Sequence, residues 1–205
     1  MPHVALPPAR SSSNARHHST GFSMVEVLAS IVVLSFGLLG VAGLQASALK
    51  YGRDARQQSV GVTLARELAE MMRANAQVAG KTSNNPYFGN FSGTGLAPAT
   101  TSSCLNVGST CTSTTDVANA QMTDWLQRVE SALPGARVVT CNDAAPYDAN
   151  GLPQWNCTAS TGTGQPVSVI KLGWTREKTD NSIQGASDSD ARPLVVLPLT
   201  PGGQS

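Results

Sequence analysis

Four cysteines are the residues whose chemistry the sequence specifies most directly. All lie in the second half of the 205-residue chain, at Cys104, Cys111, Cys141 and Cys157. Their spacing fits neither a C-x-x-C redox motif nor a zinc site, whereas an even number of cysteines in an exported domain is typical of disulfides. Three pairings are possible, and the sequence alone does not choose among them. The local pairs Cys104–Cys111 and Cys141–Cys157 are the favoured connectivity, with no free thiol.

The histidines bear on catalysis through their position. His3, His17 and His18 all lie near the N-terminus. If the segment 1–21 is removed as a leader, the remaining chain contains no histidine. A Ser-His-Asp or Cys-His catalytic site and a histidine-ligated zinc are then impossible.

Acidic residues also fail to suggest a catalytic or metal site. Five aspartates fall in polar segments and are expected to be solvated: Asp143, Asp148, Asp180, Asp188 and Asp190. The Asp188-Ser-Asp190 segment lacks the spacing of an EF-hand calcium loop. We therefore expect no enzyme activity, no metal and no cofactor.

One carboxylate, that of Glu26, stands beside a long apolar segment. The segment 27–44 contains no charged residue, and as a helix it would be about 27 Å long, close to the thickness of a bilayer's hydrocarbon core. An acid at such a position is a functional candidate. If cleavage frees an amino group at Phe22, the amine of a neighbouring subunit could approach Glu26 from the side. We expect this pairing to set axial register; the alternative is a glutamate that snorkels to the interface.

The spacing of apolar residues along the chain predicts two helices. The apolar run continues into an amphipathic stretch with Val62, Ala65, Leu68, Ala69 and Met72 at helical spacing. This pattern predicts one helix over about 23–76, ended by Gly80 and the residues after it. A second helix is expected over 116–133, capped by Thr115 or Asp116 and stopped by Pro134-Gly135.

Three apolar segments, 136–141, 166–174 and 193–199, are predicted strands. The apolar face of the amphipathic half of the first helix must be buried against another element, and these strands supply apolar faces for it. The sequence therefore predicts an α+β fold in which a long N-terminal helix packs on a small antiparallel sheet. Disulfides are expected to reinforce a domain that is rich in loops.

Charge distribution limits the possible partners. The formal net charge is only +1, so the chain has no global electrostatic footprint for nucleic acid. The segment 1–21 contains Arg10 and Arg16 and no acid. It is therefore a short basic stretch ahead of the apolar run, and the spanning helix implies contact with membrane lipid.

The junction Thr20-Gly21-Phe22-Ser23-Met24-Val25-Glu26 resembles the prepilin-type signal of the type IV pilin family. This resemblance implies that a prepilin peptidase/methyltransferase cuts after Gly21 and methylates Phe22, and that Glu26 is the assembly acid. It also implies a pilin-like fold with three parts. Residues 1–21 are a cleaved cytoplasmic leader, 22–76 a long helix that spans the membrane over 27–49, and 77–205 a globular domain.

A second resemblance is to the PilV-type minor pilins, or type IV pilus modification proteins. It rests on residues 37–46, 71–75 and 167–174, Trp125 with 133–136, and Cys141. It implies a non-enzymatic subunit that takes part in type IV pilus assembly, priming or modification. Expected partners are other major and minor pilins and the inner-membrane assembly platform.

The resemblance further implies a single pass through the inner membrane, with the N-terminus cytoplasmic and the C-terminal domain periplasmic, and later a place in the pilus at the cell surface. Two alternatives remain open. One is a pseudopilin of a type II secretion system, and the other is a signal-anchored periplasmic binding protein or enzyme.

Overall fold

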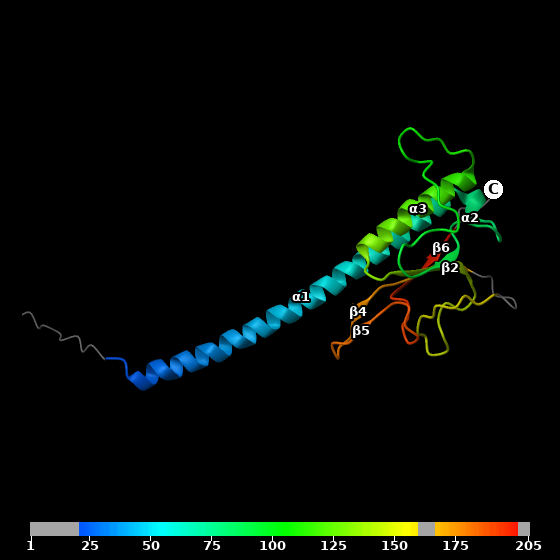
Figure 1. The fold of residues 1–205 in the computed structure, drawn as a ribbon. Coiled ribbons are helices and arrows are strands. Elements are labelled where there is room, and N and C mark those ends of the chain that lie inside the picture. The colour runs from blue at the N-terminus through cyan, green and yellow to red at the C-terminus, as the bar shows by residue number, and fades with distance from the viewer. Residues whose placement is uncertain (1–20, 160–166, 201–205) are drawn as a thin grey trace, which may run out of the picture. The chain divides into compact units, whose positions relative to one another are not determined.

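The computed structural model describes residues 21–159 and 167–200 (Figure 1). The chain divides into two compact units, Met1–Ala48 and Leu49–Ser205. Its helices are α1 (Met24–Ala74), α2 (Ala76–Ala79) and α3 (Thr114–Ala132). Its strands are β1 (Gly89–Phe91), β2 (Arg137–Asp143), β3 (Val167–Gly173), β4 (Arg176–Glu177), β5 (Ile183–Gln184) and β6 (Val195–Leu199). The expected leader apart from Gly21, the three histidines and the first residue of the expected strand 166–174 lie outside the described residues.

Helix α1 forms because its sequence combines a long apolar run with an amphipathic continuation. It begins at Met24 and ends at Ala74, close to the predicted limits. Among the described residues it is the one helix long and apolar enough to cross a membrane. Asn75 then interrupts the helix, and its side-chain Nδ2 donates to the carbonyl oxygen of Thr114 over 2.7 Å.

The serines within the apolar part of α1 bond to the helix itself. Ser30 Oγ donates to the carbonyl oxygen of Glu26 over 2.7 Å, and Ser35 Oγ donates to that of Ile31 over 2.7 Å. Hydroxyls bonded back to the preceding turn need no water. This segment is therefore compatible with apolar surroundings despite its polar residues.

In the second unit, the amphipathic part of α1 packs against α3 and the sheet. The buried positions of α1 are Gly61, Leu64, Ala65, Leu68, Ala69 and Met72. The predicted stripe is confirmed except at Val62, which is only partly buried. Gly61 permits close packing, because a Cβ there would lie 2.8 Å from Cζ3 of Trp174.

Helix α3 runs alongside the second half of α1 (Figure 1). Trp125 is fully buried, and its Nε1 donates to the carbonyl oxygen of Leu64 over 3.0 Å. At the surface of the same contact, Arg128 Nη2 lies 2.7 Å from Glu67 Oε1. Burial of Trp125 therefore fixes α3 on α1, with a half-exposed ion pair beside it.

The start of α3 corrects the prediction. The cap is Ser113, whose Oγ accepts the backbone N–H of Asp116 over 3.1 Å, so neither Thr115 nor Asp116 caps the helix and it begins two residues earlier than expected. Serine satisfies an otherwise unpaired N–H of the first turn. Asp116 lies in that first turn, where its negative charge interacts favourably with the positive end of the helix dipole.

The main sheet is antiparallel with strand order β1-β2-β3-β6. Val138 pairs with Leu172, and Leu172 pairs with Val195. Because side chains alternate between faces, Val138, Ile170 and Leu172 join the helices in one core. The predicted α+β fold, a long helix on a small antiparallel sheet with two disulfides, is confirmed.

The three shortest strands, β1, β4 and β5, were not predicted from the sequence. β1 has only three residues, Gly-Asn-Phe, and pairs at the edge through Gly89 and Thr140. β4 and β5 contribute two residues each and form a separate two-stranded ribbon. An ion pair links this ribbon to α1, because Lys50 Nζ lies 2.9 Å from Glu177 Oε1.

Two threonines, buried Thr140 and half-buried Thr123, give a stability test with opposite signs. Thr140 is 1% exposed, and its Oγ1 has no hydrogen-bond partner among the described residues. Thr123 Oγ1 donates to the carbonyl oxygen of Asn119 over 2.7 Å and accepts the N–H of Ser102 over 3.1 Å. In a fragment beginning at Leu49, Thr140→Val should raise the free energy of unfolding by about 1 kcal/mol, whereas Thr123→Val should lower it by about 1 kcal/mol. Urea unfolding measures both, and a loss of stability in Thr140→Val would contradict the assignment.

Candidate functional site

The N-terminal junction lies at the beginning of α1. Phe22 is 82% exposed, and Ser23 opens the helix by accepting the backbone N–H of Glu26 over 3.0 Å and that of Val27 over 3.2 Å. Glu26 therefore sits in the first turn of α1. The structure places Gly21, Phe22 and Glu26 together within one turn of the helix start.

Glu26 has no partner for its carboxylate among the described residues. The spacing of Ser23 and Glu26 is that of a capping box, yet no bond from Glu26 back to the N–H of Ser23 forms, and no Lys or Arg of the described chain pairs with it. The carboxylate is thus available to a cation from outside the chain.

Large apolar side chains are exposed from Phe22 to Leu44, in the described part of the first unit. Those more than half exposed are Phe22, Met24, Val25, Leu28, Ile31, Val33, Leu34, Phe36, Leu38, Leu39, Val41 and Leu44. A continuous apolar surface of this length marks a site of contact with lipid or with other apolar helices. The arrangement can anchor the chain in a membrane or pack it into a helical bundle, and Glu26 lies at its beginning.

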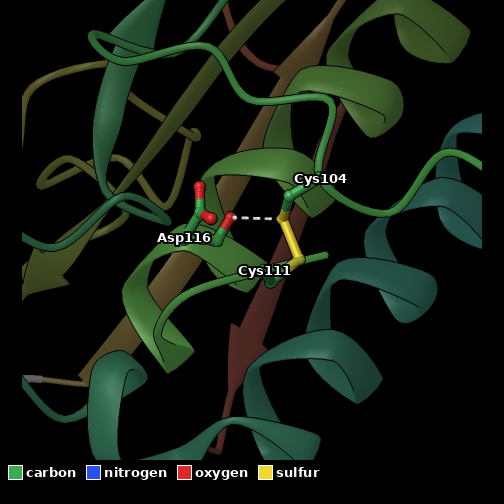
Figure 2. A group of neighbouring side chains, drawn as sticks. All are labelled: Cys104, Cys111 and Asp116. Atoms are coloured by element: carbon green, nitrogen blue, oxygen red, sulfur yellow. Dashed lines mark hydrogen bonds between the residues drawn. A yellow bond between two sulfur atoms is a disulfide. The ribbon is translucent and has the colours of Figure 1, made fainter. Parts of the chain in front are cut away.

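The first disulfide closes a loop in front of α3. Cys104 and Cys111 are joined, and Asp116 lies beside them (Figure 2). Cys104 Sγ is 3.6 Å from the carbonyl oxygen of Asp116. A disulfide sulfur carries no hydrogen, so the dashed line in Figure 2 represents a close contact and not a donated hydrogen bond.

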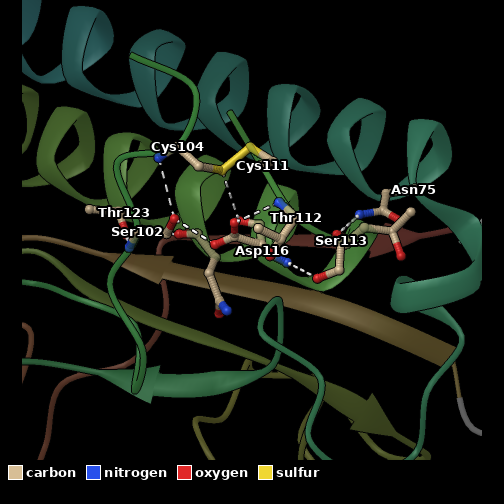
Figure 3. Close-up of a disulfide and its surroundings, with 10 residues drawn as sticks. Asn75, Ser102, Cys104, Cys111, Thr112, Ser113, Asp116 and Thr123 are labelled. Carbon is tan, nitrogen blue, oxygen red and sulfur yellow. Dashed lines mark hydrogen bonds between the residues drawn. A yellow bond between two sulfur atoms is a disulfide. The ribbon is translucent and has the colours of Figure 1, made fainter. Parts of the chain in front are cut away.

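Asp116 clamps this loop onto the helix (Figure 3). Its Oδ1 accepts the hydroxyl of Ser102 over 2.7 Å, and its Oδ2 accepts the N–H of Thr112 over 3.2 Å. The Ser102 hydroxyl and then the Thr112 N–H lower the pKa of Asp116 below its ordinary value. Both ends of the disulfide loop are therefore held at the N-terminus of α3.

The second disulfide joins Cys141 to Cys157, so the two pairs are the favoured local ones. Beside it lies a buried ion pair that the sequence analysis did not foresee. Lys171 Nζ is 2.5 Å from Asp143 Oδ2, and both side chains are 0% exposed. The expectation that Asp143 is a solvated loop acid is wrong. Asp143 ends β2 and Lys171 lies in β3, so strand pairing carries both groups inward.

Backbone groups complete this cluster. Asp143 Oδ1 accepts the N–H of Ala145 and of Thr158, each over 2.9 Å. Lys171 Nζ donates to the carbonyl oxygen of Asn156 over 2.6 Å. The ion pair therefore fixes both sides of the segment that the Cys141–Cys157 disulfide closes.

The pKa of Asp143 reflects two opposed effects. Burial raises the pKa, but the Lys171 ammonium and the N–H groups of Thr158 and Ala145 outweigh burial, and the pKa lies below its ordinary value. Asp143 is therefore ionised, and it neutralises a lysine that would otherwise be an unpaired buried charge.

The sequence contains one indication that Lys171 has a buried acidic partner. Lys171 stands between Ile170 and Leu172 in a predicted strand, where alternation directs it to the opposite face from these core residues. A lysine in the centre of an apolar strand requires a carboxylate partner if that face is covered. Only the pairing of β2 with β3 identifies Asp143 as the partner.

The remaining aspartates shape turns and surface pairs. Asp148 Oδ2 lies 2.8 Å from Arg192 Nη1, and Asp190 Oδ2 lies 3.1 Å from Lys178 Nζ. Asp188 Oδ2 accepts the N–H of Gly185 over 2.7 Å, and Asp180 Oδ1 accepts that of Ser182 over 2.9 Å. Each acid thus bonds to a different group of the chain.

Two groups combine cysteines with an acid at distances suited to a metal. In each, the possible ligand atoms lie within 4.8 Å of one another: Cys104, Cys111 and Asp116, and Cys141, Asp143 and Cys157. Metal binding by cysteine requires a thiolate, and all four sulfurs are in disulfides. The chemistry of these donors therefore does not fit a metal ion.

Comparison with known families identifies the junction and the long helix. Residues 16–42 match the prokaryotic N-terminal methylation motif, and residues 43–125 match the family described as type IV pilin Tt1218. No characterised protein and no solved structure matches the chain. The first match contains Gly21, Phe22 and Glu26, and the second extends from the apolar helix into α3. Together with the α+β fold of a long helix on a small sheet, these matches establish that the chain is a type IV pilin-like protein.

Proposed function

We propose that this protein is a non-enzymatic minor pilin of the PilV type that takes part in type IV pilus assembly, priming or modification. The observation that carries the proposal is the junction itself. Gly21 and Phe22 stand directly before an exposed apolar helix. Glu26 lies in the first turn of that helix, within the matched methylation motif, and its carboxylate has no partner in the described part of the chain.

In this proposal, a prepilin peptidase/methyltransferase cuts after Gly21 and methylates the new amino group of Phe22. The apolar residues of α1 hold the subunit in the inner membrane over 27–49, with the leader in the cytoplasm and the globular part in the periplasm. Two disulfides support an oxidising compartment for that part.

Assembly brings the charged groups together. The subunit leaves the membrane through the inner-membrane assembly platform and joins major and minor pilins in the fibre. In an apolar bundle, the carboxylate of Glu26 offsets the charge of a neighbour's methylated Phe22 amine. The pairing also fixes how far one helix is displaced along the other.

The processing step is tested by Gly21→Val. This variant should remain in the membrane as an uncut precursor that keeps its leader, because a branched side chain at the cleavage position hinders access to the peptide bond. The matched control is Ser19→Val, which adds similar bulk two positions upstream and should be cut normally. Immunoblots compare precursor and mature bands, and normal cleavage of Gly21→Val would exclude this site.

Fractionation separates the minor pilin from the pseudopilin alternative. A minor pilin should be found with major pilin in fibres sheared from the cell surface. A pseudopilin should stay in the envelope fraction, and its loss should block secretion of an exported enzyme while leaving pili unchanged. The match of residues 43–125 to a type IV pilin supports the first outcome.

A further inference from the structure

An uncharged cleft lies beside the first turns of α3. It has a volume of about 710 Å³, within the range of small-ligand sites. Its lining comes from the segment after α2, from β1, from residues 97–100 and from α3. No lining residue is Asp, Glu, Lys or Arg; many carry an amide or a hydroxyl, including Asn84, Asn90, Thr100 and Asn119.

The walls of the cleft are held in place by hydrogen bonds of buried side chains. Asn85 is buried and its Nδ2 donates to the carbonyl oxygens of Ala79 and Lys81, over 2.9 and 3.1 Å. Tyr87 is fully buried and its hydroxyl lies 2.5 Å from Gln121 Oε1. These bonds fix the segment that carries Asn84.

The opposite walls are fixed in a similar way. Glu130 accepts the backbone N–H of Gly95 over 2.6 Å and that of Leu96 over 3.1 Å, immediately before residues 97–100. β1 is held by its pairing with β2. Because hydrogen bonds already order the segments that line the cleft, little conformational entropy is lost when a ligand binds there.

Several amides of the lining are free to bind. Asn84 and Asn119 have no side-chain hydrogen bond among the described residues, and Asn90 receives only a long one, 3.4 Å from Arg137 Nε. Each amide offers two donor hydrogens and an acceptor oxygen. Phe88 is half-buried and contributes an apolar surface to the same cleft.

This combination favours one class of ligand. Sugar hydroxyls are both donors and acceptors, so they match amide side chains, and the C–H face of a sugar ring packs on apolar and aromatic groups. The two cations at the rim already donate to neutral oxygens, Lys81 Nζ to Thr115 Oγ1 over 3.0 Å and Arg137 to Asn90. We propose that this cleft binds a short, uncharged carbohydrate. The proposal does not depend on fibre assembly.

The test uses the full chain in a detergent without a sugar headgroup. Immobilised neutral oligosaccharides built from hexoses or N-acetylhexosamines are the probes, with acidic oligosaccharides and uncharged peptides beside them. At least one neutral sugar should be retained, and titration calorimetry of that sugar then gives its affinity. Retention of none, of acidic sugars alone, or of peptides alone would overturn the proposal.

Variants locate the binding. Asn119→Ala and Asn84→Gly should each weaken the titrated sugar about 10-fold, the effect of losing one to two hydrogen bonds. Glycine suits position 84 because its φ is +51°. The matched control is Gln127→Ala, which removes an exposed α3 amide that lines a different hollow and should leave affinity unchanged. Unchanged affinity in both cleft variants, with normal melting, would show that the sugar binds elsewhere.

Discussion

Replacing Asp143 with alanine is expected to lower the free energy of unfolding of the fragment beginning at Leu49 by about 3–5 kcal/mol. The variant leaves the Lys171 ammonium in the interior without its carboxylate. It also removes the acceptor for the N–H groups of Ala145 and Thr158. Urea unfolding measures the loss, most of which comes from leaving a buried lysine charge without its carboxylate; the two N–H groups are only partly buried and add less.

A control for this prediction is the exposed pair of Lys178 and Asp190, whose side chains are 37% and 64% exposed. Lys178→Ala should change the free energy of unfolding by less than about 1 kcal/mol, because water screens exposed pairs. The double variant Asp143→Leu with Lys171→Met should recover much of the lost stability. A loss below about 1 kcal/mol in Asp143→Ala would mean that the pair is open to water.

The ion pair of Asp143 and Lys171 also predicts how the stability of the folded protein depends on pH. The folded-state pKa of Asp143 lies below 3.8, its ordinary value, so the folded protein holds this carboxylate ionised more firmly than the unfolded chain does. Its contribution is complete above the unfolded-state pKa and is lost as the pH falls through the folded-state pKa. Wild type should therefore lose more stability than Asp143→Asn between about pH 4 and pH 2. Thermal melting at each pH measures the difference.

Glu26→Ala is expected to reach the membrane and to be cleaved, yet to enter fibres at least about tenfold less than wild type. Insertion favours apolar residues, so the substitution does not oppose it. In the assembled bundle, however, a neighbour's amine at Phe22 would lie in apolar surroundings without a carboxylate. An unpaired buried charge costs several kcal/mol, and one tenfold change requires only about 1.4 kcal/mol.

Two variants make this result specific. Glu26→Gln keeps the size and removes the charge, so it should be nearly as defective as Glu26→Ala. Glu70→Ala removes an exposed acid from the same helix, one that pairs with Arg73, and should enter fibres normally. Immunoblots of sheared fibres against membranes measure all three. Normal amounts of Glu26→Ala in the fibre fraction would show that this subunit does not need the charge pair.

The long helix and the three longest strands could be predicted because their patterns are local and sustained. The uncharged segment 27–44, followed by an apolar stripe at helical spacing, allows no element but a helix. Strands β3 and β6 show apolar side chains along most of their length, and β2 carries the apolar pair Val138 and Val139 near its start. Their existence was predicted, and the pairing of β2 with β3 emerged only from the fold.

The features that were missed depend on contacts between distant residues. β1 is a strand only because β2 offers it an edge at Thr140; its sequence Gly-Asn-Phe is poor in strand-forming residues. Asp143 resembled a loop acid because its partner, Lys171, lies far along the chain in a different strand. The cap at Ser113 was missed because several Ser and Thr residues precede α3, and the sequence does not rank them.

The N-terminal mass of protein recovered from sheared fibres tests the pilin assignment most directly. If the subunit is cut after Gly21, methylated and assembled, the fibre fraction should contain a chain that begins with N-methyl-Phe22. Its mass should also show both disulfides, four hydrogens lighter than the reduced chain. A mature chain that begins after Leu44, without the apolar helix, would contradict a pilin-type subunit, as would a chain that keeps the segment 1–21.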